Sequence, residues 1–465
     1  MEQKNHVLHV RRYLTPHGIT ISLGKKSYDI NYPAKIWQQF PSVYHHQFAD
    51  TIAHAMTVHL AFINFREDHQ ILYHFPPPAI EPLIFKGLMY SLPEDAHAVK
   101  KFKTSDYVKL FFNAYHRIKF DKRPRYERFK NVNRNNKKKA LIPFTFGKDS
   151  LLSFALAKEL GIDPVLIFFR EPRCPYENRQ KVILNRRFFK KFGKAVTFFP
   201  LSTGWLREVS DTGPWWGWDL LLTQYNLLIV PYLFAYRAKY LFWSHEQSCN
   251  ITFTDPEGYV INPVFEQNHQ WLLSINSSFK TLGCNTMFTS LIEPLHDLMI
   301  MYVLHHRYPD IGRFQNSCFG DEPEAKNRRW CGCCPKCARM YIFAKAIGLD
   351  PKKIGFTQNI LVSQKRHLFS LFGCTSQDSS YDASGIGRDE QLLSFYLAYK
   401  RGTNGPLLKE FKKKHLKEAE KRKNELFKTF FIINPSQTIP CDLKTKITKI
   451  YEEELKSLKK DLSIK

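Results

Sequence analysis

Short apolar strands and longer helices are predicted to alternate between residues 140 and 243, and this alternation constrains the fold more than any other feature. The apolar runs that suit buried strands are Ala140–Phe144, Pro164–Phe169, Ala195–Phe199 and Lys239–Trp243. The predicted helices between them are Leu151–Leu160, Lys181–Phe192 and Leu220–Tyr236. Parallel strands need crossover helices of this kind. The sequence therefore predicts an α/β fold with a doubly wound parallel sheet, in which ligands bind at the carboxyl ends of the strands.

The remainder of the chain is predicted to form separate regions, because 465 residues are too many for one ordinary core. Alternating residues from about 6 to 32 predict a β-meander and Val43–Leu60 predicts a helix, so we interpret residues 1–105 as an N-terminal α+β domain. Residues 106–139 suit a basic helix and linker, and residues 140–350 the α/β domain. Opposite charges spaced i,i+4 predict a peripheral, helical and basic C-terminal region over residues 351–465.

The charge of the chain predicts an anionic partner. The formal net charge is +26, and the excess is concentrated in Arg117–Lys139 and in the tail from Lys400 onward. Nucleic acid, a membrane surface and a polyphosphorylated small substrate would all suit this charge, and a solvated surface is the alternative. Polar residues interrupt the longest apolar stretch, Asp219–Trp243, so no membrane span is expected. The start of the chain does not resemble a signal peptide, and the grouped cysteines favour a reducing cytoplasmic location.

The segment Thr145–Ser150 joins the first predicted strand of the α/β region to the next helix and reads Thr-Phe-Gly-Lys-Asp-Ser. Backbone N–H groups and the helix dipole at such a junction can bind a phosphate. Lys148 would supply a positive charge, Ser150 a hydroxyl, and Gly147 room for the ligand to approach the backbone. The segment is not a Walker loop, because Asp149 follows the lysine at the position where that motif has Ser or Thr. A turn that only opens a helix is the alternative interpretation.

Five cysteines lie between Cys318 and Cys337, and Cys331, Cys334 and Cys337 are each three residues apart. Four thiolates with this spacing can close tetrahedrally on Zn²⁺. We expect a structural zinc site formed by Cys318, Cys331, Cys334 and Cys337, with Cys333 as a substitute ligand. An iron–sulfur cluster or reduced free cysteines are the alternatives.

The segment Thr145–Ser150 resembles the Ser-Gly-Gly-Lys-Asp-Ser signature of the PP-loop ATP pyrophosphatase superfamily, with Thr in place of the Ser and Phe146 in place of the first Gly. The resemblance implies an adenine nucleotide alpha hydrolase-like fold and cleavage of ATP between its α and β phosphates, usually with adenylation of a substrate. A bulky side chain at Phe146 is expected to narrow the phosphate pocket. The residues to which the resemblance assigns ATP binding, with Mg²⁺ present, are Thr145, Gly147, Lys148, Asp149 and Ser150.

Two families within this superfamily share further features with residues 140–350. The phosphate loop and the late Cys-x-x-Cys-x-x-Cys resemble 7-cyano-7-deazaguanine synthases, which adenylate a carboxylate and convert it to a nitrile with ammonia. The segments Ser244–Asn250, Asn268–Trp271 and Trp330–Cys337 resemble bacterial UDP-N-acetylmuramoyl-L-alanyl-L-glutamate epimerases. The chain length and the additional N-terminal domain also favour the epimerases.

An acyl-adenylate makes the adjacent C–H bond more acidic, so a nearby base can remove and return that proton. The second resemblance makes His245, Glu246 and His269 the candidate acid/base residues, with Cys249 a weaker one. A hydrogen-bonded structural role is the alternative for each. The polar residues expected to bind substrate or to fix the histidines are Asn250, Asn268 and Gln270.

The expected function is ATP-dependent activation of a carboxylate with ATP, Mg²⁺ and Zn²⁺ as cofactors, and we favour epimerisation of the terminal L-glutamate of a UDP-muramoyl dipeptide in peptidoglycan synthesis. A deazaguanine carboxylate is the runner-up substrate. A tRNA-modifying enzyme that uses Arg117–Lys139 to bind phosphates and a non-catalytic homologue, suggested by Phe146, are further alternatives. The expected partners are a nucleotide and a small carboxylic acid, and nucleic acid is less favoured.

Overall fold

A five-stranded sheet lies at the centre of the protein, in a computed structural model that describes residues 7–62, 70–99, 103–124, 126–129, 136–208, 217–318, 320, 322–373 and 385–462. Its strands are β6 (Asn136–Pro143), β7 (Asp163–Arg170), β8 (Val196–Pro200), β9 (Ala238–Trp243) and β12 (Met287–Ser290). All neighbours are parallel, in the order β12-β9-β6-β7-β8. The predicted α/β fold with a parallel sheet is therefore confirmed.

Helices cover both faces of this sheet because its strands are apolar on both sides. Ala140 and Ile142 of β6 pack into one hydrophobic core with α5 (Lys148–Glu159), α6 (Pro175–Phe192) and α10 (Asp297–Arg307). Leu141 points the other way, into a second core with α7 (Leu221–Leu228), α8 (Val230–Tyr236) and α9 (His269–Thr281). The single helix predicted over Leu220–Tyr236 is two helices, since Pro231 cannot donate a backbone hydrogen bond and stands in the first turn of α8.

The N-terminal region forms a second five-stranded sheet, of order β3-β2-β1-β4-β5. The predicted meander is confirmed: β1 (Val7–Thr15), β2 (Gly18–Leu23) and β3 (Lys26–Asn31) are antiparallel. The strands β4 (Gln70–Tyr73) and β5 (Ile118–Phe120) extend it in parallel. The helices of this region are α1 (Ala34–Gln39), α2 (His45–Thr57), α3 (Glu81–Val99) and α4 (Thr104–Tyr115). Within the predicted basic segment α4 is followed by β5, and Arg125 and Arg134 lie outside the described residues.

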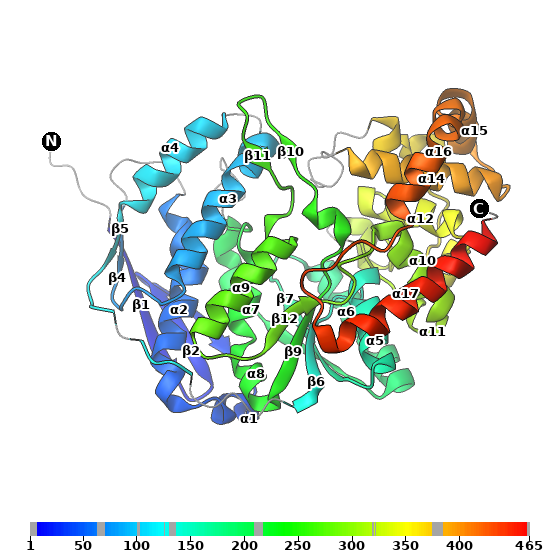
Figure 1. Ribbon diagram of the computed structural model, residues 1–465. Helices are drawn as coiled ribbons and strands as arrows, with labels where there is room; N and C mark the ends of the chain where they lie inside the picture. The colour runs from blue at the N-terminus through cyan, green and yellow to red at the C-terminus, as the bar shows by residue number, and fades with distance from the viewer. Residues whose placement is uncertain are drawn as a thin grey trace.

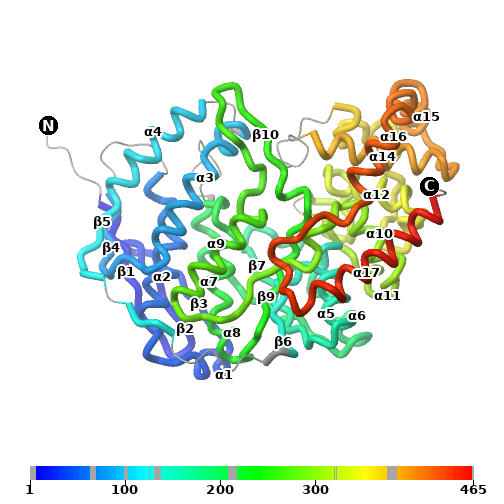
Figure 2. Tube along the Cα trace, viewed as in Figure 1, coloured from blue at the N-terminus to red at the C-terminus, as the bar shows by residue number. Residues whose placement is uncertain are grey.

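The C-terminal region is helical, as predicted. It contains α14 (Ile386–Lys400), α15 (Pro406–Lys414), α16 (Leu416–Phe430) and α17 (Cys441–Asp461), which lie at the opposite end of the molecule from the N-terminal sheet (Figures 1 and 2). The expectation of a peripheral position is wrong. Leu392, Phe411 and Tyr451 are fully buried in the same core as α10 and α12 (Pro335–Ala346), because the regularly spaced apolar residues of these helices all face inward.

Among the described residues, no helix combines the length and the apolar character that crossing a bilayer requires.

Candidate functional site

The predicted phosphate loop, Thr145–Ser150, follows β6 at the point where the strand order of the central sheet reverses. β6 lies between β7 and β9, so the loop is adjacent to the segment that leaves β9 at Ser244. The hydroxyls of Ser153 and Ser244 are 3.0 Å apart and connect the two segments. In open α/β sheets such a reversal leaves a crevice at the carboxyl ends of the strands, which is where ligands bind.

Phe146 does not narrow the loop, contrary to expectation. Its backbone adopts the left-handed conformation that glycine favours, with a φ of 58°. Its ring is fully buried against Phe144 and Phe188, with ring centroids 4.8 and 5.5 Å away. The loop thus keeps the backbone conformation that favours glycine at this position and directs the side chain into the core.

Hydroxyl groups surround the start of α5. The Thr145 hydroxyl accepts a hydrogen bond from the Gly147 N–H at 3.3 Å, and the Ser317 hydroxyl accepts one from the Lys148 N–H at 3.3 Å. A Cβ atom at Gly147 would lie 3.2 Å from the Thr145 hydroxyl and 3.8 Å from that of Ser317. The N-cap residue of α5 is Gly147, which has no side chain that could cap the helix. The start of α5 thus combines the positive end of a helix dipole with a cluster of hydroxyl groups, which are features that suit an anion.

Lys148 is the centre of a buried charge cluster, which we define as Lys148, Asp149, Glu246, Asp297 and Glu390. The ammonium group pairs with Asp149 and, at 2.5 Å, with Asp297, the first residue of α10. Burial alone would lower the pKa of Lys148, but the two carboxylates raise it above its usual value. Lys148 is therefore charged, and carboxylate oxygens beside it are the ligands that Mg²⁺ prefers.

The three predicted acid/base residues are brought together around one narrow polar cavity. His245 and Glu246 follow β9, His269 begins α9, and Glu293 and Thr438 complete much of the wall. His245 stacks on Trp243 and is 6% exposed, yet neither of its ring nitrogens has a hydrogen-bond partner among the described residues. Burial lowers the pKa of His245 to about 3, so the imidazole is neutral. His245 is therefore a buried, neutral imidazole whose two ring nitrogens lack partners in the described part of the chain, a state that His54 of α2 shares.

Glu246 connects the cavity to the charge cluster. Its carboxyl accepts hydrogen bonds from the Ser248 N–H at 2.6 Å and from the Ser248 hydroxyl at 2.7 Å. Burial and the nearby Asp297 raise the pKa of Glu246 to about 8, although Lys148 opposes the shift. The Cys249 thiol lies 3.5 Å from the same carboxyl, and burial raises its pKa well above the usual value. Glu246 can hold or release a proton near neutral pH, whereas Cys249 stays a neutral thiol.

The polar residues near His269 fix the start of α9. The Asn250 side chain accepts a hydrogen bond from the His269 N–H at 2.8 Å, and Asn268 caps the helix by accepting one from the Trp271 N–H at 2.7 Å. Gln270 is exposed, and its amide nitrogen lies 3.3 Å from the His269 ring. Of the two roles expected for these residues, positioning of the histidine is the one that their contacts support.

Besides Glu293 and Thr438 of the cavity wall, three residues around Lys148 escaped the sequence interpretation. Asp297 follows β12 after a six-residue loop and begins a helix, a pattern that marks the carboxyl edge of the sheet and could have revealed it. Ser317 precedes a zinc-ligand candidate. Glu390 comes from α14, where its Oε1 accepts a hydrogen bond from the Leu298 N–H at 2.7 Å; its Oε2 has no partner among the described residues. No local pattern connects Glu390 to residues almost a hundred positions earlier.

The four predicted zinc ligands, which we call the cysteine knot, are confirmed as a cluster able to bind a metal. The sulfur atoms of Cys318, Cys331, Cys334 and Cys337 are buried and all lie within 4.8 Å of one another. A tetrahedral zinc site with Zn–S bonds of about 2.3 Å has sulfur–sulfur distances of about 3.8 Å, close to the 3.6 Å between Cys331 and Cys337. Cys333 points elsewhere, toward Glu324. The donor set and its spacing fit structural zinc.

A short segment connects the cysteine knot to the phosphate loop. Asn316 donates its backbone N–H to the Phe146 carbonyl at 2.7 Å, and Lys181 of α6 donates to the Asn316 carbonyl at 2.7 Å. Ser317 contacts Lys148, as described above, and the next residue is Cys318. The knot therefore anchors the two residues that form one wall of the loop.

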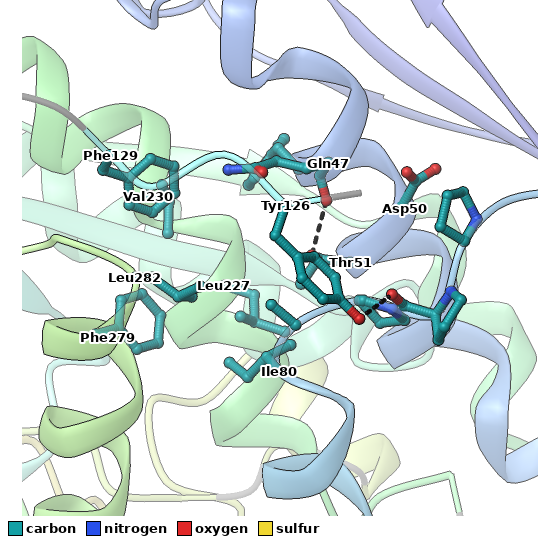
Figure 3. Close-up of a pocket in the computed structure, with 15 residues that line it drawn as sticks. Gln47, Asp50, Thr51, Ile80, Tyr126, Phe129, Leu227, Val230, Phe279 and Leu282 are labelled. Carbon is teal, nitrogen blue, oxygen red and sulfur yellow. Dashed lines mark hydrogen bonds between the residues drawn. The ribbon is translucent and has the colours of Figure 1, made fainter. Parts of the chain in front are cut away.

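A narrow apolar cavity of about 40 Å³ lies elsewhere, between the N-terminal region and helices α7, α8 and α9. Figure 3 shows Leu227, Val230, Phe279 and Leu282 among the residues that line it, with Tyr126 near the centre of the view. The Tyr126 hydroxyl donates to the Pro77 carbonyl at 2.9 Å. The one carboxylate in its lining is Asp50, which pairs with Arg12 at 2.5 Å. This cavity lacks the reactive groups that gather around Lys148.

No known family model matches this chain, and neither does a curated protein or a solved structure. The functional conclusion therefore depends on the chemistry and placement of the residues described above.

Proposed function

We propose that the protein is an ATP-dependent enzyme that activates a substrate carboxylate as an acyl-adenylate, with release of pyrophosphate. The observation that carries the proposal is that two features lie side by side where the strand order of the central sheet reverses. A polar helix start suited to a phosphate lies beside Lys148, and a cavity containing the unpartnered, buried His245 lies next to the same charge cluster. The strand order β8-β7-β6-β9-β12 also supports the adenine nucleotide alpha hydrolase-like fold.

In the adenylation step the phosphates of ATP would lie at the start of α5. The N–H groups of the first turn, the hydroxyls of Thr145 and Ser317, and Lys148 would neutralise and orient them. Asp149 and Asp297 would hold Mg²⁺, which reduces the charge of the polyphosphate. An oxygen of the substrate carboxylate attacks the α phosphorus, and the bond to the β-phosphate oxygen breaks. The alternative of a non-catalytic homologue loses its basis, because Phe146 lies in the core.

The acid–base cavity would act on the activated substrate. Adenylation removes the negative charge of the carboxylate, so the adjacent C–H bond becomes acidic enough for a neighbouring base. Epimerisation needs one group to take this proton and another to return one on the opposite face. The available groups are His245, which is neutral, the imidazole of His269, and the carboxyl of Glu246, which has a pKa of about 8. Water would then hydrolyse the acyl-adenylate to the epimerised acid and AMP.

The preferred substrate is the UDP-muramoyl dipeptide ending in L-glutamate, whose several negative charges suit a chain of net charge +26. A deazaguanine carboxylate remains the runner-up. The test is incubation with ATP and Mg²⁺ plus either acid, with ammonia present for the second. AMP, product mass and glutamate chirality would be measured, with Lys148→Met as the inactive control.

The proposal predicts AMP formation, D-glutamate in a product of unchanged mass, and incorporation of one deuterium when the reaction runs in D₂O. A nitrile product would favour the runner-up. Absence of AMP with both acids would contradict the proposed function.

A further inference from the structure

An arginine-lined cleft of about 840 Å³ opens at the carboxyl ends of β7 and β8. Arg170 is the last residue of β7, and Arg179 and Arg186 lie on α6, two helical turns apart. We call this the arginine cleft. Val182 and Ile183 lie between the arginines of α6 and provide an apolar floor.

The three guanidinium groups are available to a ligand. All are exposed, and in the described part of the chain no carboxylate forms an ion pair with any of them. The one acidic residue in the lining is Glu171, which is buried and already bound by Arg207 at 3.2 Å and by the Tyr225 hydroxyl at 2.7 Å. The cleft thus carries three uncompensated positive charges. Arginine forks match the geometry of phosphate oxygens, so phosphate groups are the ligand that they recognise best.

Asn178 adds a hydrogen-bond acceptor to the lining of the cleft. The side chain lines the cleft and is 8% exposed, and its Nδ2 donates to the Glu171 carbonyl at 2.8 Å. This bond fixes the orientation of the amide, because a carbonyl oxygen can only accept. The Oδ1 atom is buried and has no partner among the described residues. It needs a hydrogen-bond donor, such as a nucleobase N–H or a sugar hydroxyl.

An aromatic platform stands next to the cleft. Trp205 follows Ser202 of the lining by three residues and is 51% exposed. The guanidinium of Arg173 lies 5.1 Å from its ring centroid. Exposed tryptophans beside basic residues can stack on nucleobases.

We infer that the arginine cleft binds the nucleoside diphosphate part of the acid substrate, with its phosphates on Arg170, Arg179 and Arg186 and a donor group on Asn178. α6 separates this site from the phosphate loop, because Lys181 on its other face reaches Asn316. The cleft is therefore a second nucleotide site. The inference rests on the proposed function only in identifying the ligand as part of the acid substrate.

The test is isothermal titration of the full chain with UDP, with uridine, pyrophosphate and a short single-stranded RNA as comparison ligands. The variants are Arg179→Gln and Arg186→Gln. Arg187→Gln is the matched control, since Arg187 is an exposed arginine of the same helix that does not line the cleft. Gly147→Ala places a methyl group at the proposed phosphate position of the ATP site without straining the backbone.

We expect UDP to bind more tightly than uridine or pyrophosphate, and each cleft substitution to weaken it about tenfold. Arg187→Gln and Gly147→Ala should leave UDP binding within about twofold of wild type. Loss of UDP binding in Gly147→Ala, equal weakening by Arg187→Gln, or no UDP binding to the wild type would each overturn the inference. RNA binding that depends on Arg179 and Arg186 without UDP binding would also overturn it. Failure of the proposed function would instead appear as absent AMP formation with UDP binding intact.

Discussion

The cysteine knot and the charge cluster around Lys148 lie at the two ends of one short segment, yet the chain builds them in different ways. The knot takes its four ligands from residues 318–337. The charge cluster collects Lys148, Glu246, Asp297 and Glu390 from four distant parts of the chain. The knot can close once a metal binds, whereas the cluster exists only when the sheet and the C-terminal helices have packed. The cysteine knot therefore stabilises one wall of the site that contains the charge cluster.

The strongest test of this comparison is removal of the metal. Cys334→Ser should abolish binding of about one zinc ion per chain, since a structural site needs all four ligands. The thermal unfolding midpoint should fall by roughly 10 °C or more, and ATP affinity should fall with it because Asn316 and Ser317 lose their anchor. Cys333→Ser is the matched control, because its thiol points toward Glu324. Equal zinc loss in both variants would show that the knot is wrongly assigned.

The next largest effect is expected from Lys148→Met. The change removes the ammonium group from half-buried Asp149 and buried Asp297, while Arg339 stays 3.8 Å from Asp297, so the free energy of unfolding should fall by about 3 kcal/mol. ATP-dependent AMP formation should fall at least about a hundredfold. Lys158→Met, in the same helix but exposed, should change neither quantity. Normal AMP formation by Lys148→Met would separate the charge cluster from the chemistry.

Phe146 tests whether the phosphate loop and the core are independent, because its backbone belongs to the loop and its side chain to the core. Phe146→Gly loses a buried ring at a cost of about 3–5 kcal/mol and recovers about 1–2 kcal/mol by relieving the left-handed backbone, so the free energy of unfolding should fall by about 1–4 kcal/mol. ATP affinity should change less than about threefold by calorimetry. Phe154 belongs to the same aromatic cluster but has a helical backbone, so Phe154→Ala should lower the free energy of unfolding by the full cost of about 3–5 kcal/mol. ATP binding tenfold tighter in Phe146→Gly would show that the ring obstructs the loop.

Much of the fold and part of the site could be predicted from local patterns. The apolar runs of β6, β7, β8 and β9 and the spacing of the cysteines each reflect a requirement that neighbouring residues satisfy among themselves. The side-chain direction of Phe146, the break at Pro231 and the inward packing of α14 depend on tertiary contacts. Glu390 is the clearest case, because its role appears only when α14 packs against α10.

A smaller effect concerns the pH dependence contributed by Glu246. Its pKa of about 8 in the folded state exceeds the ordinary 4.5, so the folded state holds the proton more tightly than the unfolded chain. This contribution to stability is complete below about pH 4.5 and is lost as the pH rises toward 8. Thermal unfolding from pH 5 to 8 should therefore show wild type losing stability relative to Glu246→Gln, by an amount on the order of 1 kcal/mol or more. Parallel curves for the two proteins would contradict the raised pKa.

The most direct test of phosphate binding at the start of α5 is the affinity of Gly147→Ala for ATP. The backbone at Gly147 has a φ of −66°, which alanine adopts without strain, but its Cβ would enter the space between the hydroxyls of Thr145 and Ser317. If that space holds a phosphate, calorimetry with ATP and Mg²⁺ should show affinity at least about tenfold weaker than wild type, with an unchanged unfolding midpoint. Equal ATP affinity in the two proteins, or no ATP binding to the wild type, would contradict the account.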